Sequence, residues 1–150
     1  MSKQRIKRLQ FILDMAKKQE QADLQSWGQL QQQLAAEQQK VEQLQGYLGE
    51  YQQNLTSQPG GASGMISGGQ VQNLISFINQ LKSAIDQQNM QMNLIQQRVD
   101  QARDVYLKSR AKVEALQKLI NKRQEQLSVV EEKQLQKLMD EAASRMSRAR

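Results

Sequence analysis

The sequence predicts an all-α fold: a long two-helix antiparallel coiled-coil hairpin with a glycine-rich turn and an overhanging C-terminal helix. Apolar residues recur at alternating steps of three and four along two long stretches, which is the spacing of a coiled-coil seam. Five of the eight glycines and the only proline lie between these stretches. Thirty glutamines, 4% aromatic residues and a mean hydropathy of −0.76 are typical of long solvated helices.

The first helix is expected at about residues 3–55 of a single domain that covers residues 1–150. Twelve of its fifteen seam positions are apolar, and the residues between them are mostly polar. A helix packed on a globular core would instead carry a broader stripe over a shorter element. The seam positions are Ile6, Leu9, Leu13, Ala16, Glu20, Asp23, Trp27, Leu30, Leu34, Glu37, Val41, Leu44, Leu48, Tyr51 and Leu55.

The turn is expected over residues 56–70, which read TSQPGGASGMISGGQ. Glycine weakens a helix, and proline removes a backbone donor and clashes with the preceding turn. One helix must therefore stop before this stretch and another must start after it. No Gly-Lys-Ser/Thr follows the glycines, so the stretch does not match an ATP-binding phosphate loop.

The second helix is expected at about residues 71–148 and repeats the spacing of the first. Beyond Val130 the phase of the pattern slips, and Leu135, Leu138 and Ala142 continue it, as in a coiled-coil stutter. The seam positions before the slip are Leu74, Ile78, Leu81, Ile85, Gln88, Met92, Ile95, Val99, Ala102, Tyr106, Ser109, Val113, Leu116, Ile120, Arg123, Leu127 and Val130.

The helices differ in length, so the second one should overhang the first. If Leu55 faces Val71 across the turn, the residue numbers of each facing pair add to about 126. The beginning of the first helix then lies opposite the region around Arg123. Residues 124–150 would then project without a partner while still carrying an apolar stripe, which needs a groove on another protein. The stripe contains Leu127, Val129, Val130, Leu135, Leu138, Met139, Ala142, Ala143 and Met146.

Polar residues interrupt the seam and favour the hairpin. The same offset brings Glu37 near Gln88, and brings Asp23 near a basic stretch around Lys108. Polar seam residues cost stability but specify the register and the partner. In a parallel homodimer Glu20 would meet its own copy, which is unfavourable.

Charge and composition restrict the function. The chain has a net charge of +6 and contains neither cysteine nor histidine, so the commonest metal ligands and the commonest general base are missing. We expect no enzyme, no metal and no cofactor. Acidic residues interrupt the basic ones and aromatics are few, which argues against nucleic-acid binding. No apolar run could span a membrane, and the basic start beside Phe11 and Ile12 offers at most a peripheral membrane contact.

The residues around the turn resemble the flagellar export protein FliJ family. The chain reads LQGYLGEYQQNL before the glycines and VQNLISFINQLKSAI after them. These stretches are similar to the Leu-x-x-Tyr-x-x-x-Tyr element that the family carries before its turn and to the Phe-Ile-x-x-Leu-x-x-Ala-Ile element that it carries after it. The matching positions are Leu44, Tyr47, Tyr51, Phe77, Ile78, Leu81, Ala84 and Ile85.

The resemblance implies a cytoplasmic component of the flagellar type III export apparatus, peripheral to the inner membrane at the flagellar base. Its implied partners are the flagellar export ATPase, the membrane export gate protein and substrate-specific export chaperones. The implied gate-binding patch is Leu44, Tyr47, Tyr51, Phe77, Leu81 and Ala84. The implied ATPase-binding end is Arg5, Lys7, Arg8, Phe11, Leu135, Leu138, Met139 and Met146. The residues alone also leave open a coiled-coil chaperone or scaffold without an ATPase partner.

Overall fold

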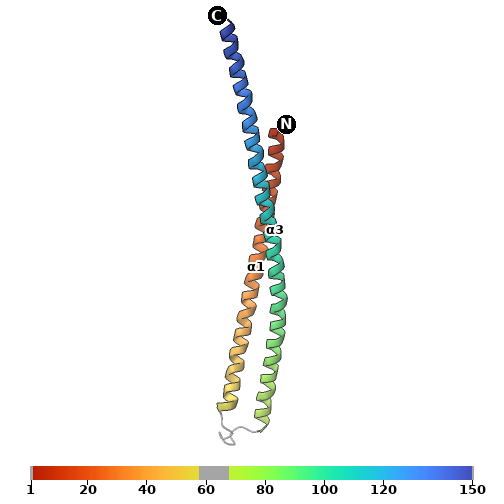
Figure 1. Cartoon of the computed structure of the whole chain (residues 1–150). Helices are drawn as coiled ribbons and strands as arrows, with labels where there is room; N and C mark the ends of the chain where they lie inside the picture. The colour runs from red at the N-terminus through yellow and green to blue at the C-terminus, as the bar shows by residue number, and fades with distance from the viewer. Residues whose placement is uncertain (1, 58–67, 150) are drawn as a thin grey trace. The chain divides into compact units, whose positions relative to one another are not determined.

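Two long helices form the structure. The computed structural model describes residues 2–57 and 68–149, and within these ranges it contains α1 (Ser2–Ser57) and α3 (Gly68–Arg148) and no strand (Figure 1). The helices extend slightly into the predicted turn, because residues 56–57 and 68–70 are helical. The rest of that turn, residues 58–67, lies outside the described residues. The predicted all-α antiparallel hairpin is confirmed.

Side chains near the C-terminal ends of both helices interact with the helix backbone. The hydroxyl of Thr56 donates to the carbonyl oxygens of Gln52 at 3.2 Å and Gln53 at 3.1 Å, which is a local bond that threonine makes to carbonyls of the preceding turn. In α3 the last turn carries Arg145 and Arg148, whose positive charges suit the negative end of the helix dipole.

The chain divides into two compact units. The terminal unit consists of Met1–Leu24 and Val105–Arg150, and the central unit is Gln25–Asp104. Each unit contains a segment of α1 packed against a segment of α3 that runs in the opposite direction.

The central unit is held together by a narrow apolar seam. Val41 of α1 is buried, as are Ile78, Ile85, Ile95 and Val99 of α3. The side-chain amide of Gln88 donates a hydrogen bond to the Glu37 carboxylate, as the predicted offset requires. Burial of one stripe on each helix, with polar residues elsewhere, is what the 3-4 spacing provides.

The terminal unit uses the same kind of seam. Ile6, Leu13 and Ala16 of α1 are buried, and Ile120 is the buried residue that α3 supplies. The hydroxyl of Ser109 donates a hydrogen bond to the Asp23 carboxylate. The amide of Gln19 on the same helix also donates to this carboxylate, at 3.0 Å. Across the seam, the partner of Asp23 is therefore a hydroxyl within the basic stretch and not one of the cations beside it.

The predicted seam is confirmed along α1, where each of the fifteen positions is buried or half-buried. Along α3 the prediction is wrong at Arg123 and Val130, which are exposed. Both lie in the part of α3 that faces the start of α1, where only Leu127 keeps a half-buried side chain.

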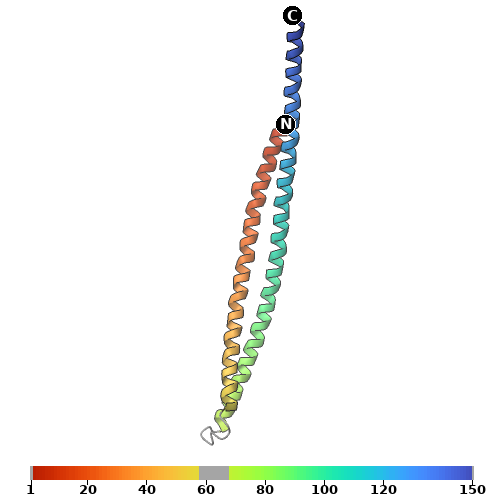
Figure 2. The ribbon, with the colours of Figure 1, turned by 60° about the vertical axis from the view of Figure 1, so that its left-hand side comes forward.

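The predicted start of the overhang at residue 124 is also wrong. Lys3 of α1 forms an ion pair with Glu131 at 3.8 Å, so α1 covers α3 as far as that residue. Figures 1 and 2 show α3 continuing past the first turn of α1. The facing pairs Asp23–Ser109 and Lys3–Glu131 have residue numbers that add to 132 and 134. These sums are about seven above the expected 126, and a shift of one heptad keeps both apolar stripes in contact.

Candidate interaction surfaces

The aromatic patch of the central unit joins the two helices. We use this name for Leu44, Tyr47, Tyr51, Phe77, Leu81 and Ala84. The rings of Tyr51 and Phe77 meet edge to face, with centroids 4.9 Å apart and planes inclined by 76°, an arrangement that aromatic quadrupoles favour. This contact brings the α1 and α3 parts of the patch together.

Only part of the aromatic patch is accessible to a partner. Tyr47 is 53% exposed and Phe77 is 41% exposed. The remaining four residues are half-buried, because they lie in or beside the seam. Tyr47 stands one helical turn before Tyr51, so it extends the surface that Phe77 and Tyr51 form.

A second feature of the central unit was missed by the sequence reasoning. An open depression of about 860 Å³ runs along α3, and its lining is rich in amide and hydroxyl groups. The lining residues are Gln72, Asn73, Ile75, Ser76, Asn79, Gln80, Ser83, Ala84 and Gln87. Ala84 belongs to both the depression and the aromatic patch, and Ile75 adds an exposed apolar side chain. The recurrence of small polar residues at helical spacing was the available signal.

The terminal surface lies in the terminal unit and has a basic part and an apolar part. We use this name for Arg5, Lys7, Arg8 and Phe11 of α1 and Leu135, Leu138, Met139 and Met146 of α3, all of which are exposed. Phe11 is accompanied by two other exposed apolar residues: Ile12, which the sequence analysis named beside it as a peripheral membrane contact, and Met15, which it did not name. The position of Met15 four residues after Phe11 was the available signal.

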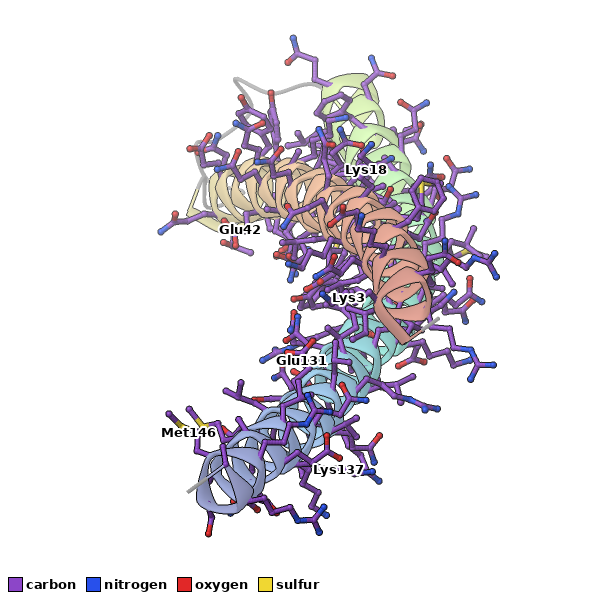
Figure 3. All side chains as sticks on the ribbon, turned by 90° about the horizontal axis from the view of Figure 1, so that it is seen from above. Lys3, Lys18, Glu42, Glu131, Lys137 and Met146 are labelled. Carbon is purple, nitrogen blue, oxygen red and sulfur yellow. The ribbon has the colours of Figure 1, made fainter. Side chains whose placement is uncertain are left out.

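The basic part of the terminal surface lies beside α3 where α1 begins. Figure 3 labels Lys3 and Glu131, whose ion pair joins the two helices at this point. Close by, a groove of about 250 Å³ is lined by Arg5, Ile6, Arg123, Gln126, Leu127 and Val130. Leu135 follows about one helical turn beyond Glu131. The structure therefore brings Arg5 against residues 123–130 of α3 and leaves the apolar part of the surface further along the helix.

The charges of the terminal surface are unevenly distributed. Residues 3–18 of α1 contain six basic side chains and one acidic one. Residues 132–149 of α3 contain four basic and three acidic side chains. A partner of this surface would therefore meet a cationic α1 segment and a mixed, apolar α3 segment.

Among the described residues, no cluster of acidic side chains could hold a metal ion. Neither described helix contains an apolar run that could cross a membrane. The fold thus defines an all-α coiled-coil protein that exposes apolar groups and cations on its surface.

The comparison with known families identifies the group within that class. The family described as Flagellar FliJ protein matches residues 5–150, and the chain therefore belongs to the FliJ family. The resemblance carried by the residues around the turn is confirmed, and the chain is a flagellar protein export component. No curated protein and no solved structure matches it.

Proposed function

We propose that the chain is a non-enzymatic, stalk-like component of the flagellar type III export apparatus. In this proposal the terminal surface engages the ring of the export ATPase, and the aromatic patch contacts the membrane export gate protein. The chain thereby links the two, acts in the cytoplasm beside the inner membrane at the flagellar base, and also handles substrate-specific export chaperones.

The observation that carries the proposal is the exposed apolar part of the terminal surface. Leu135, Leu138, Met139 and Met146 are 57% to 75% exposed. Large apolar side chains gathered on one part of a soluble protein mark a site that another protein covers. The neighbouring cations of α1 add long-range attraction to an acidic partner and would speed the encounter.

The aromatic patch supports the second contact. Tyr47 and Phe77 present exposed rings, and aromatic side chains are enriched among the residues that dominate binding energy. Tyr51 holds the Phe77 ring edge to face, so this part of the surface is ordered before a partner arrives.

The first experiment measures ATP hydrolysis and ring formation by the export ATPase of the same organism, with and without this chain. We expect faster hydrolysis and more rings when the full chain is present. A chain that ends after Glu131 should lose this effect, because it lacks the apolar part of the terminal surface.

A charge variant tests the basic part. Replacing Arg5 and Arg8 with glutamine should weaken the stimulation, whereas the same change at Lys17 and Lys18 should have little effect. All four side chains are exposed cations of α1, but only the arginines belong to the terminal surface. Full stimulation by the truncated chain would contradict the ATPase contact. No effect of the full chain on an active ATPase would favour a coiled-coil chaperone or scaffold.

A further inference from the structure

The last part of α3 carries a compact apolar stripe with helical spacing. Its members are Leu135, Leu138, Met139, Ala142 and Met146. Steps of three, four, seven and eleven residues from the first member keep all five on one face of an α-helix. Every side chain in residues 132–149 is exposed. Figure 3 labels Lys137 and Met146 on this part of the helix, beyond the pair formed by Lys3 and Glu131.

We propose that this stripe pairs with the same stripe of a second copy of the chain, with the two helices antiparallel. Leu135 would pack against Met146 of the second copy, and Met139 would pack against Ala142 of the second copy. The steps from Leu135 to Met139, Ala142 and Met146 are four, three and four residues. This is the same alternation that forms the seams between α1 and α3.

The length of the uncovered helix fits this occupant. In each proposed layer the two residue numbers add to 281, so residue 149 of the second copy would lie beside residue 132. The uncovered segment 132–149 would then be covered along its whole length, which is roughly 27 Å.

The distribution of charge selects the antiparallel direction. Residues 131–141 contain four acidic and two basic side chains, whereas residues 142–149 contain the basic Arg145 and Arg148 and no acidic residue. Antiparallel pairing places Glu131 and Glu132 of one copy beside the end of the other copy that carries Arg148, while Asp140 and Glu141 meet near the centre of the pair. Parallel pairing would place Glu131 and Glu132 beside their own copies, which repel.

The same charges argue against a membrane surface as the occupant. An amphipathic helix that lies on anionic lipid carries basic residues along its polar face. Here Glu132, Asp140 and Glu141 are interspersed with the basic residues. A second copy carries both charge signs.

The association should be weak and dependent on concentration. A helix pair of this length buries an area at the low end of specific interfaces, and a dimer that exchanges with its monomer follows mass action. Sedimentation equilibrium of the full chain should show an average mass that rises from the monomer mass of 17.2 kDa towards twice that value. A monomer mass throughout, from about 5 to 500 µM, would overturn the proposal.

Two variants with the same charge change locate the contact. Met139→Glu places a carboxylate in the centre of the stripe and should keep the chain monomeric. Ser144→Glu places the same group on the opposite face of the same turns and should leave the mass increase unchanged. Both side chains are exposed, and helicity measured by circular dichroism confirms that each variant is folded. Equal effects of the two variants would show that the stripe is not the interface.

The direction of pairing can be tested with disulfides, because the chain contains no cysteine. Chains carrying Leu135→Cys and chains carrying Met146→Cys are mixed, oxidised with glutathione disulfide and analysed by intact mass. Antiparallel pairing predicts an excess of the mixed disulfide over the two symmetric ones. An excess of symmetric disulfides would overturn the proposed direction.

These experiments use the chain alone, so their outcome is independent of the proposed ATPase contact. The stripe belongs to the terminal surface, which means that self-pairing and engagement of the ATPase would exclude each other. A stripe that self-pairs without any effect on the ATPase would contradict only the proposed function.

Discussion

The side-chain amide of Gln88 donates a hydrogen bond to the Glu37 carboxylate inside the seam of the central unit. The two polar groups satisfy each other at positions that would otherwise be apolar. A shift of seven residues along α3 would bring Leu81 or Ile95 opposite Glu37 and leave its carboxylate without Gln88. The carboxylate would keep only the 3.4 Å contact of its Oε1 with Lys40. Since the loss of a hydrogen bond to a half-buried charged group is costly, the bond with Gln88 favours one register among those that the apolar spacing permits.

The Glu37–Gln88 pair can be tested by replacing its members. We expect Gln88→Leu alone to lower the free energy of unfolding by about 1–3 kcal/mol, because the Glu37 carboxylate loses its partner across the seam. The double variant Glu37→Leu/Gln88→Leu should be as stable as the parent chain or more stable, because two apolar side chains then meet in the seam. Urea unfolding followed by circular dichroism measures both values.

A matched control for this pair lies on the surface of α3. Gln96 donates a hydrogen bond to Asp100 at 3.1 Å, and both side chains are exposed. Gln96→Leu should therefore change the free energy of unfolding by less than about 0.5 kcal/mol. If Gln88→Leu were as stable as the parent chain, the Glu37–Gln88 bond would not select the register.

Two neighbouring residues of α3 show the contrast between the buried seam and the exposed surface. Ile95 is 2% exposed, whereas Leu94 is 57% exposed. We expect Ile95→Ala to lower the free energy of unfolding by about 2–5 kcal/mol, because it removes buried methyl groups and leaves a cavity. Leu94→Ala should change it by less than about 0.5 kcal/mol. Similar effects at both positions, measured by urea unfolding, would contradict the narrow seam.

The aromatic patch predicts that its two exposed rings behave differently. Tyr47→Ala should weaken binding to the export gate protein and leave thermal unfolding unchanged. Phe77→Ala should weaken the same binding and also destabilise the chain, because the edge-to-face contact with Tyr51 contributes about 0.5–1.5 kcal/mol. Calorimetric titration gives the affinities, and circular dichroism gives the unfolding midpoints.

A negative control for the patch is Met90→Ala, which removes an exposed apolar side chain of α3 outside the aromatic patch. Gate affinity should be unaffected by this change. Unchanged gate affinity in both Tyr47→Ala and Phe77→Ala would rule out the patch as the gate contact.

The position of the Lys3–Glu131 ion pair predicts the result of truncation. A chain that ends after Glu131 should unfold at the same urea concentration as the full chain, because residues 132–149 are exposed. A chain that ends after Arg123 should be less stable, because it also loses the half-buried Leu127. Most of that loss should come from packing, since the ion pair itself is exposed and such pairs contribute little. Equal stability of the two truncated chains would contradict the observed overlap.

The sequence by itself determined the two helices and the face that each one buries. The spacing from Ile6 to Leu55 is regular enough that every predicted seam position of α1 is shielded from solvent. A period of 3.5 residues specifies one stripe of a helix whatever lies opposite. The same spacing also predicts that Tyr47 is accessible to solvent, because Tyr47 does not fall on a seam position.

Only the tertiary structure decided how far the helices overlap in the terminal unit. The spacing cannot separate two registers that differ by a heptad, because both place apolar residues opposite apolar residues. The observed register is the one in which Asp23 contacts Ser109 and Lys3 lies near Glu131. The contact of Tyr51 with Phe77 could not be predicted from the sequence for the same reason. It depends on which residues of two distant segments face each other, and a local repeat does not contain that information.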